Sequence, residues 1–309
     1  MNTVTYVPQR ASGSRIETIR GLALHLRCWG EPDLVTPDRP PLLLLHGWMD
    51  VGASFQFLVD ALAALEGPSR FVVAPDWRGF GLSAAPAADS YWFPDYLGDL
   101  DAIVDRLAPA GAIDLLGHSM GGNVVMLYAG VRPQRVRRLV NLEGFGMPRT
   151  RPEQAPQRLA QWLDELKRPE RLRPYPSLQA VAERLLANDP LLPADKAAWL
   201  APHWARPAAD GSGFELLADP AHKRVNPVLY QVDEVLESWK RISAPLLWVE
   251  GDQTATEKWW GHRYSRDEFH QRLAVVTTLA RKVTLSPCGH MLHHVQPQSL
   301  ARELAAFLA

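Results

Sequence analysis

A serine flanked by glycines carries the clearest chemistry in this sequence. The segment Gly117-His118-Ser119-Met120-Gly121 has the form G-x-S-x-G, and it lies between an apolar run and a helical pattern. In this context the chain turns tightly and lifts the serine hydroxyl to the edge of a sheet, at the start of a helix. The N-terminus of a helix favours negative charge that develops beside it. Ser119 is therefore predicted to be a nucleophile.

A histidine close to the C-terminus is the predicted general base. His290 follows the apolar run 282–285 and precedes the last helical pattern. Histidine titrates near neutral pH, so it can take a proton from Ser119 and return it. His293 and His294 follow closely and are expected at the mouth of a pocket. We interpret the three as neighbouring loop residues without a metal ion, and no metal or organic cofactor is expected.

Two backbone amides are expected to stabilise the oxyanion that forms when Ser119 attacks a carbonyl group. Met120 follows the nucleophile directly and supplies one amide. Trp48 supplies the other, from the loop that begins at His46-Gly47 after an apolar run. The side chains of Trp48 and His46 are expected to face the substrate.

Apolar runs that alternate with helical patterns must position these residues. Such alternation predicts an α/β fold in which a mostly parallel sheet is flanked by helices. An antiparallel pair, 16–20 and 22–29, is expected at one edge of the sheet. The other expected strands are 42–45, 71–74, 113–116, 136–142, 245–249 and 282–285, and the expected helices are 95–107, 123–131, 265–280 and 298–308.

The alternation stops near Met147 and resumes near residue 240. Six prolines between residues 148 and 176 interrupt any long element there, and apolar residues recur at helical spacing. We assign residues 1–146 and 240–309 to a core and residues 147–239 to an inserted helical cap. Trp162 of the cap, with Trp92 and Phe93 of the core, is expected to line an apolar pocket.

Four segments together resemble the α/β-hydrolase fold superfamily over nearly the whole chain. They are His46-Gly47-Trp48, residues 76–83 (DWRGFGLS), residues 117–121 and Gly289-His290. The resemblance implies a Ser-His-acid triad with a cap as the pocket roof. Within residues 76–83, Asp76 and Arg78 are expected to brace the loop rather than to react.

The position of the triad acid is open between two residues. In most relatives it is an aspartate three residues past a glycine, after the strand that follows the cap; here Gly251 is followed by Asp252-Gln253-Thr254. Several haloalkane dehalogenases instead place a glutamate after the strand that follows the nucleophile helix, where this chain has Glu143. We favour Glu143, with Asp252 as the alternative acid. The likeness to dehalogenases ends there, because those enzymes use an aspartate nucleophile.

The resulting prediction is a serine hydrolase that cleaves a small to medium apolar ester through an acyl-enzyme intermediate. A C–C bond hydrolase, a lactonase, an acyltransferase or a ligand-binding member without catalysis are the alternatives.

The 33 basic and 34 acidic residues leave a net charge of -1, so neither nucleic acid nor a membrane is an expected partner. A small-molecule substrate is expected. No apolar run reaches the roughly 18 residues of a membrane span, and no secretory signal is evident at the N-terminus. A cytoplasmic protein is therefore expected, in which Cys28 and Cys288 are free thiols or form a single disulfide.

Overall fold

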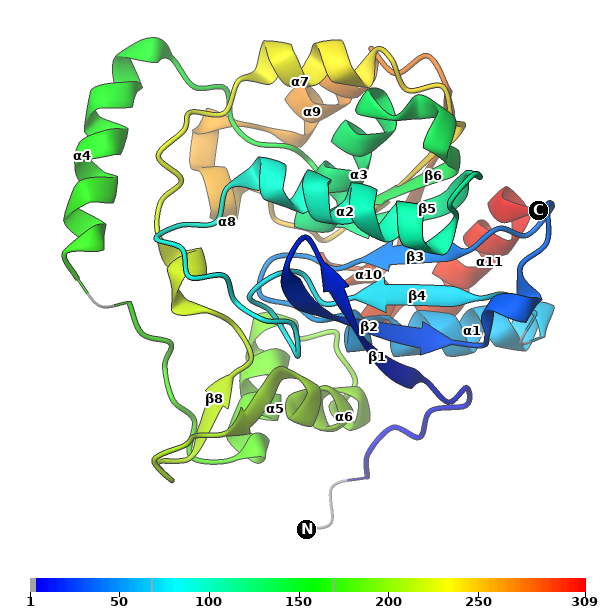
Figure 1. Ribbon diagram of the computed structural model, residues 1–309, viewed down its shortest axis with the longest axis horizontal. Helices are drawn as coiled ribbons and strands as arrows, with labels where there is room; N and C mark the ends of the chain where they lie inside the picture. The colour runs from blue at the N-terminus through cyan, green and yellow to red at the C-terminus, as the bar shows by residue number, and fades with distance from the viewer. Residues whose placement is uncertain (1–3, 68, 169) are drawn as a thin grey trace.

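An eight-stranded sheet forms the centre of the protein (Figure 1). The computed structural model describes residues 4–67, 69–168 and 170–309. The strands lie in the order β1-β2-β4-β3-β5-β6-β9-β10, and all pairs are parallel except β1–β2 and β2–β4. Their bounds are β1 Gly13–Ile19, β2 Leu22–Trp29, β3 Leu42–Leu45, β4 Val72–Pro75, β5 Ile113–His118, β6 Val136–Leu142, β9 Leu246–Gly251 and β10 Leu279–Leu285.

Helices cover both faces of this sheet, as the all-apolar central strands require. In β3, Leu42 and Leu44 belong to the apolar cluster under α1 and α11, whereas Leu43 and Leu45 belong to the cluster on the opposite face. That opposite face carries α2, α3, α7 and α9. The helix bounds are α1 Gln56–Glu66, α2 Phe93–Leu107, α3 Met120–Val131, α7 Val232–Trp239, α8 Glu257–Trp260, α9 Arg266–Leu273, α10 Leu292–Val295 and α11 Pro297–Leu308.

The predicted α/β fold is confirmed, and one predicted helix is wrong in length. Strands β3 and β6 have the bounds that the sequence predicts, and the antiparallel pair lies at the sheet edge. The helix expected at 265–280 begins as predicted, because the Ser265 hydroxyl accepts a hydrogen bond from the Glu268 amide. It ends at Leu273, however. The β-branched run at 275–278 disfavours a helix, and β10 begins directly after it.

The helices of the segment 147–239 lie in three different environments. Helices α5 (Leu178–Asn188) and α6 (Ala194–Trp204) enclose an apolar cluster that also includes Phe57 of the core. Helix α4 (Ala155–Leu166) has no buried residue and stands apart from them (Figure 1). Helix α7 packs on the core. A hairpin of β7 (Ala205–Pro207) and β8 (Phe214–Leu216), which the sequence did not predict, follows α6.

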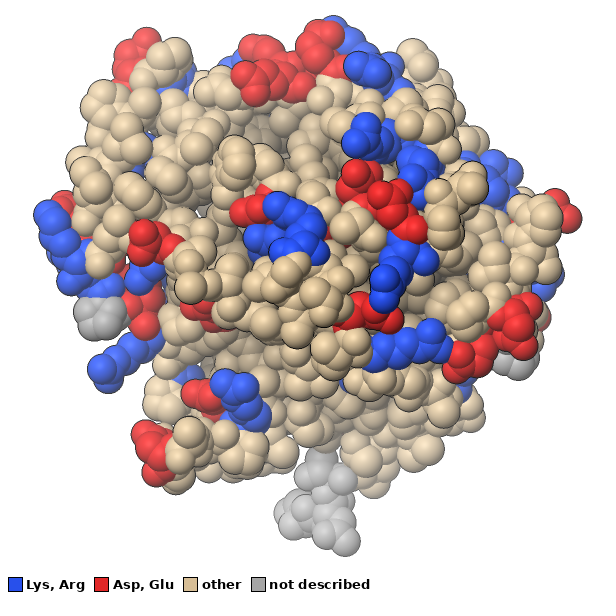
Figure 2. All heavy atoms as spheres, in the orientation of Figure 1, with Lys and Arg blue, Asp and Glu red and all other residues tan. Residues whose placement is uncertain are grey.

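Charges of both signs are interspersed over the face of the molecule in Figure 2. Both cysteines are buried and free, which agrees with the expected free thiols. Among the described residues, no helix combines the length and apolar character needed to cross a membrane.

Candidate active site

Ser119 occupies a strained turn between β5 and α3. Its backbone has φ 54° and ψ −115°, a conformation that residues with a side chain rarely adopt. The turn leaves no room for neighbouring side chains: a Cβ atom on Gly117 would lie 2.2 Å from the carbonyl oxygen of Gly121. A Cβ atom on Gly121 would lie 2.2 Å from that of Leu45. The two glycines of the motif thus permit the turn that presents Ser119.

The loop after β3 lies directly against this turn. A Cβ atom on Gly47 would be 3.1 Å from the Cβ atom of Ser119, so the loop packs closely on the nucleophile turn one residue before Trp48. Met120 is the first residue of α3, and the first amides of a helix have no partner within it. The backbone at Met49 also has a positive φ, 58°. Met120 follows Ser119 directly and Trp48 follows Gly47, and their role as oxyanion donors stays a prediction.

His46 differs from its neighbours, because its ring supports the loop from within. It is fully buried, its Nδ1 donates to the Gly47 carbonyl at 2.7 Å, and its Nε2 accepts from the Trp77 amide at 2.9 Å. Both ring nitrogens are thus engaged inside the protein. The prediction that the His46 side chain contacts a substrate is therefore wrong, because the ring is buried and has no free polar atom. We assign this ring a structural role.

Asp76 and Arg78 brace the surrounding loops through buried ion pairs. Asp76 accepts from the ring of His25 at 2.8 Å and from the Gly52 amide at 2.7 Å. Burial alone would raise the pKa of Asp76, but the hydrogen bond and the charge of His25 bring it below its usual value. Arg78 binds Asp99 through two hydrogen bonds of 2.6 Å. These contacts agree with the supporting role expected for the segment 76–83.

Glu143 lies beside His290, although 147 positions separate them in the chain. The Nδ1 atom of His290 is 2.6 Å from Oε2 of Glu143. The carboxylate is buried, and it also accepts from the Gly251 amide at 2.7 Å and from the Thr254 hydroxyl at 2.7 and 2.9 Å. Glu143 has a positive φ of 54°, as Ser119 does. Three donors, His290, the Gly251 amide and the Thr254 hydroxyl, thus fix the carboxylate against the predicted base.

Asp252 has other partners in the neighbouring loop. Its Oδ2 accepts from the Ser286 hydroxyl at 2.6 Å, and its Oδ1 accepts from the Cys288 amide at 2.9 Å. These two hydrogen bonds lower the pKa of Asp252. They bind the carboxylate to the segment that leads to His290, whereas the imidazole itself faces Glu143.

The other histidines near the site are buried. The Nε2 atom of His118 donates to the His290 carbonyl at 2.8 Å, and burial lowers the pKa of His118 well below its usual value. His293 lies under the loop after β3, with Nε2 3.3 Å from the Ser54 hydroxyl oxygen. His293 and His294 are at most 2 % exposed, so neither lies at a pocket mouth as the sequence suggested.

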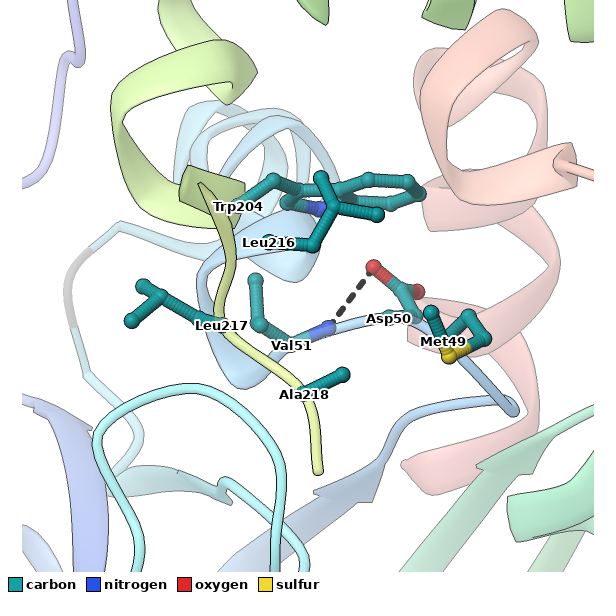
Figure 3. A pocket seen from close by; sticks show the side chains of 7 residues that line it. All are labelled: Met49, Asp50, Val51, Trp204, Leu216, Leu217 and Ala218. Carbon is teal, nitrogen blue, oxygen red and sulfur yellow. Dashed lines mark hydrogen bonds between the residues drawn. The ribbon is translucent and has the colours of Figure 1, made fainter. Parts of the chain in front are cut away.

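A cavity of about 220 Å³ opens beside the loop after β3. Trp48 and Met49 of this loop line it, together with Trp204 and Leu216 of the segment 147–239. The last three also border a smaller adjoining cavity, in which Figure 3 shows Trp204 and Leu216 facing the segment 49–51. Residues of the segment 147–239 therefore line a cavity beside Trp48, one of the two predicted oxyanion donors.

The other predicted pocket residues lie elsewhere. The Trp162 indole donates to the Ser90 hydroxyl at 2.6 Å, and Trp92 is about half exposed directly before α2. Phe93 opens that helix and packs on the core cluster. None of the three aromatic residues lines the cavity described above, and their contact with a substrate stays a prediction.

Two residues at the site were not assigned any role from the sequence. Thr254 occupies the position where most relatives carry the acid, and it donates to Glu143 instead. The ring of Trp259 packs edge-on against the His290 ring, with centroids 4.6 Å apart. The three-residue spacing from Gly251 could have indicated that Thr254 lies at the site. Nothing in the local sequence distinguishes Trp259 from the adjacent Trp260.

Comparisons with known proteins identify the fold family of the chain. Residues 40–297 match the family model of the alpha/beta hydrolase fold. A serine hydrolase-like protein of Danio rerio is 38 % identical over 107 residues, which are 34 % of this chain and 31 % of that protein. A serine hydrolase-like protein of Dictyostelium discoideum is 23 % identical over 93 % of this chain and 79 % of its own length.

Among solved structures, the thioesterase domain from the curacin biosynthetic pathway superimposes with a TM-score of 0.80 and 26 % identity. The superposition covers 96 % of this chain and 99 % of that domain. The match to the Danio rerio protein spans about a third of that protein's length. The family model covers most of this chain, and so the protein belongs to the alpha/beta hydrolase fold family.

Proposed function

We propose that this protein is a serine esterase that hydrolyses small to medium apolar esters through an acyl-enzyme. Ser119 is the nucleophile, His290 the general base and Glu143 the acid that orients it. The hydrogen bond between His290 Nδ1 and buried Glu143 carries this proposal. It leaves Nε2 as the imidazole atom that can exchange a proton with Ser119.

The proposed reaction has two halves. In the first, His290 takes the hydroxyl proton of Ser119 as the oxygen attacks the ester carbonyl. The amides of Trp48 and Met120 hold the oxyanion, and the alcohol leaves with the proton from His290. In the second, His290 activates a water molecule that releases the acid and restores Ser119. Glu143 stabilises the positive charge on the imidazole in both halves.

The strain at this site supports a catalytic role. Among the described residues other than glycine, four have a positive φ: Arg20, Met49, Ser119 and Glu143. Three of these belong to the proposed oxyanion loop, nucleophile and acid. Such conformations cost roughly 1–3 kcal/mol each, and they cluster at functional sites because the surrounding structure must hold them.

The test is hydrolysis of p-nitrophenyl esters from acetate to decanoate by the wild type, by Ser119→Ala and by a Ser212→Ala control in the exposed β7–β8 turn. We expect Ser212→Ala to match the wild type and Ser119→Ala to lose about three orders of magnitude or more in kcat/KM. Ser119 should also react with a fluorophosphonate probe. An inert wild type that leaves the probe unreacted would refute the esterase and favour a ligand-binding protein.

A further inference from the structure

One wall of the cavity beside Trp48 carries polar side chains. Helix α5 presents Val181, Arg184, Leu185 and Asn188 to it. These positions are spaced i, i+3, i+4 and i+7, which places them on one face of the helix. Val181 and Leu185 are buried in the apolar cluster of α5 and α6. Arg184 and Asn188 are exposed, and they place strong hydrogen-bond donors at the edge of the cavity.

Both donors are exposed to solvent and have no protein partner within the part of the chain that the structure describes. No ion pair or hydrogen bond engages the Arg184 guanidinium or the Asn188 amide. The neighbouring acid Glu183 accepts a hydrogen bond from Gln179 at 3.2 Å. Asp189, directly after the helix, accepts the Leu191 amide and lies near Gly289. No carboxylate of the helix therefore neutralises Arg184.

The rest of the cavity is mainly apolar and aromatic. Its lining includes Trp48, Tyr175, Trp204 and Leu216. Small-molecule sites typically combine such a lining with a few polar groups that fix the ligand's orientation. At about 220 Å³ the cavity is smaller than the roughly 300–1,000 Å³ of drug-sized sites. The occupant is therefore a short chain with one group that meets Arg184 and Asn188.

A carboxylate matches these two donors in charge and geometry. It carries a single negative charge against the one guanidinium, and its two oxygens can accept from a guanidinium and an amide together. We propose that Arg184 and Asn188 form a carboxylate-binding subsite, so that the preferred ester bears a carboxylate on the group that enters this cavity. This proposal rests on the proposed esterase function and narrows its substrate class.

Matched pairs of esters test the subsite kinetically. Monomethyl adipate is compared with methyl hexanoate, and acetoxyhexanoate with pentyl acetate, so that the carboxylate lies on the acyl or on the alcohol side. We expect the wild type to favour the charged member of one pair by about tenfold or more in kcat/KM. Arg184→Met should abolish this preference. Arg158→Met, on α4 and outside the cavity, is the control and should keep it.

Binding to the Ser119→Ala protein separates this proposal from the proposed chemistry. Calorimetric titration with the favoured charged ester should show binding that weakens about tenfold when Arg184→Met is added. If the protein hydrolyses neutral esters but shows no preference or binding that depends on Arg184, the subsite proposal is wrong. The proposed esterase function is then unaffected. Arg184-dependent binding without turnover of any ester supports the subsite and refutes the esterase.

Discussion

The loops that follow β6 and β9 reach the same edge of the sheet but carry different chemistry. The two strands are parallel neighbours, with Leu142 paired to Val249, so the residues after them lie side by side. The first loop supplies Glu143, whose carboxylate meets His290. The second supplies Thr254, whose hydroxyl donates to that carboxylate, and Asp252, which binds the loop before His290.

This difference shows that the sheet edge offers two places for an acid within reach of one histidine. The first place requires a positive φ at Glu143, and the tight turn is held because Asn141 accepts the Gly144 amide at 2.8 Å. A Cβ atom on Gly144 would lie 2.6 Å from Asn141 Oδ1. The loop after β9 has no acid that faces His290. Its Thr254 instead donates a hydrogen bond to Glu143 of the other loop.

The strongest test of the comparison removes each carboxylate in turn. Glu143→Gln keeps the shape but cannot stabilise a cationic imidazole, so we expect kcat for p-nitrophenyl butyrate to fall by about three to four orders of magnitude. Asp252→Asn is the matched control in the other loop and should stay within about tenfold of the wild type. The reverse pattern would give the acid role to Asp252.

A second test moves the acid from one loop to the other. In Glu143→Gln/Thr254→Asp, the new carboxylate stands where most relatives carry theirs, next to residue 143. We expect it to recover about tenfold or more of the kcat lost in Glu143→Gln, because an opposite charge near the imidazole is restored. Thr254→Asp alone should lower kcat, since two carboxylates then crowd one site. Absence of any recovery would show that the second loop cannot serve His290.

Much of this arrangement could be predicted from the sequence because its signals are local. The apolar runs 42–45 and 136–142 coincide with β3 and β6, and the glycines around Ser119 predict the turn at that residue. The predicted helix 265–280 was too long, because a capping signal fixes where a helix begins but the β-branched run at 275–278 determined where it ended.

Contacts between distant segments could not be predicted in the same way. The hydrogen bond from Thr254 to Glu143 joins residues 111 positions apart, and neither residue type predicts it. The hydrogen bond that His46 accepts likewise comes from the amide of Trp77, in the loop after β4. The resemblance to the α/β-hydrolase superfamily limited the candidate acids to Glu143 and Asp252, but only the three-dimensional arrangement shows which one faces His290.

A smaller effect is expected when the support of Glu143 is weakened. Thr254→Val keeps the side-chain volume but removes the hydroxyl that donates to the carboxylate. A hydrogen bond to a charged group is worth about 1.5–3 kcal/mol, so kcat should fall roughly tenfold to a hundredfold while KM changes little. Thr254→Ser restores the donor and should restore kcat. An equal loss in both variants would indicate that packing, and not the hydrogen bond, is what Thr254 supplies.

The smallest effect concerns stability, and it tests whether Asp252 is purely a structural brace. Hydrogen bonds from Ser286 and Cys288 lower the pKa of Asp252 from its usual value of about 3.8. A carboxylate with a depressed pKa stabilises the fold above its unfolded pKa, and that contribution disappears as the pH falls through the folded value. Asp252→Asn should therefore lower the Tm by a few degrees at most near neutral pH.

The difference in Tm between the variant and the wild type should disappear below about pH 3.8, as thermal unfolding followed by circular dichroism can show. A gap that persists unchanged at low pH would mean that the charge of Asp252 does not contribute, and that the two loops differ in more than the partner of their carboxylates.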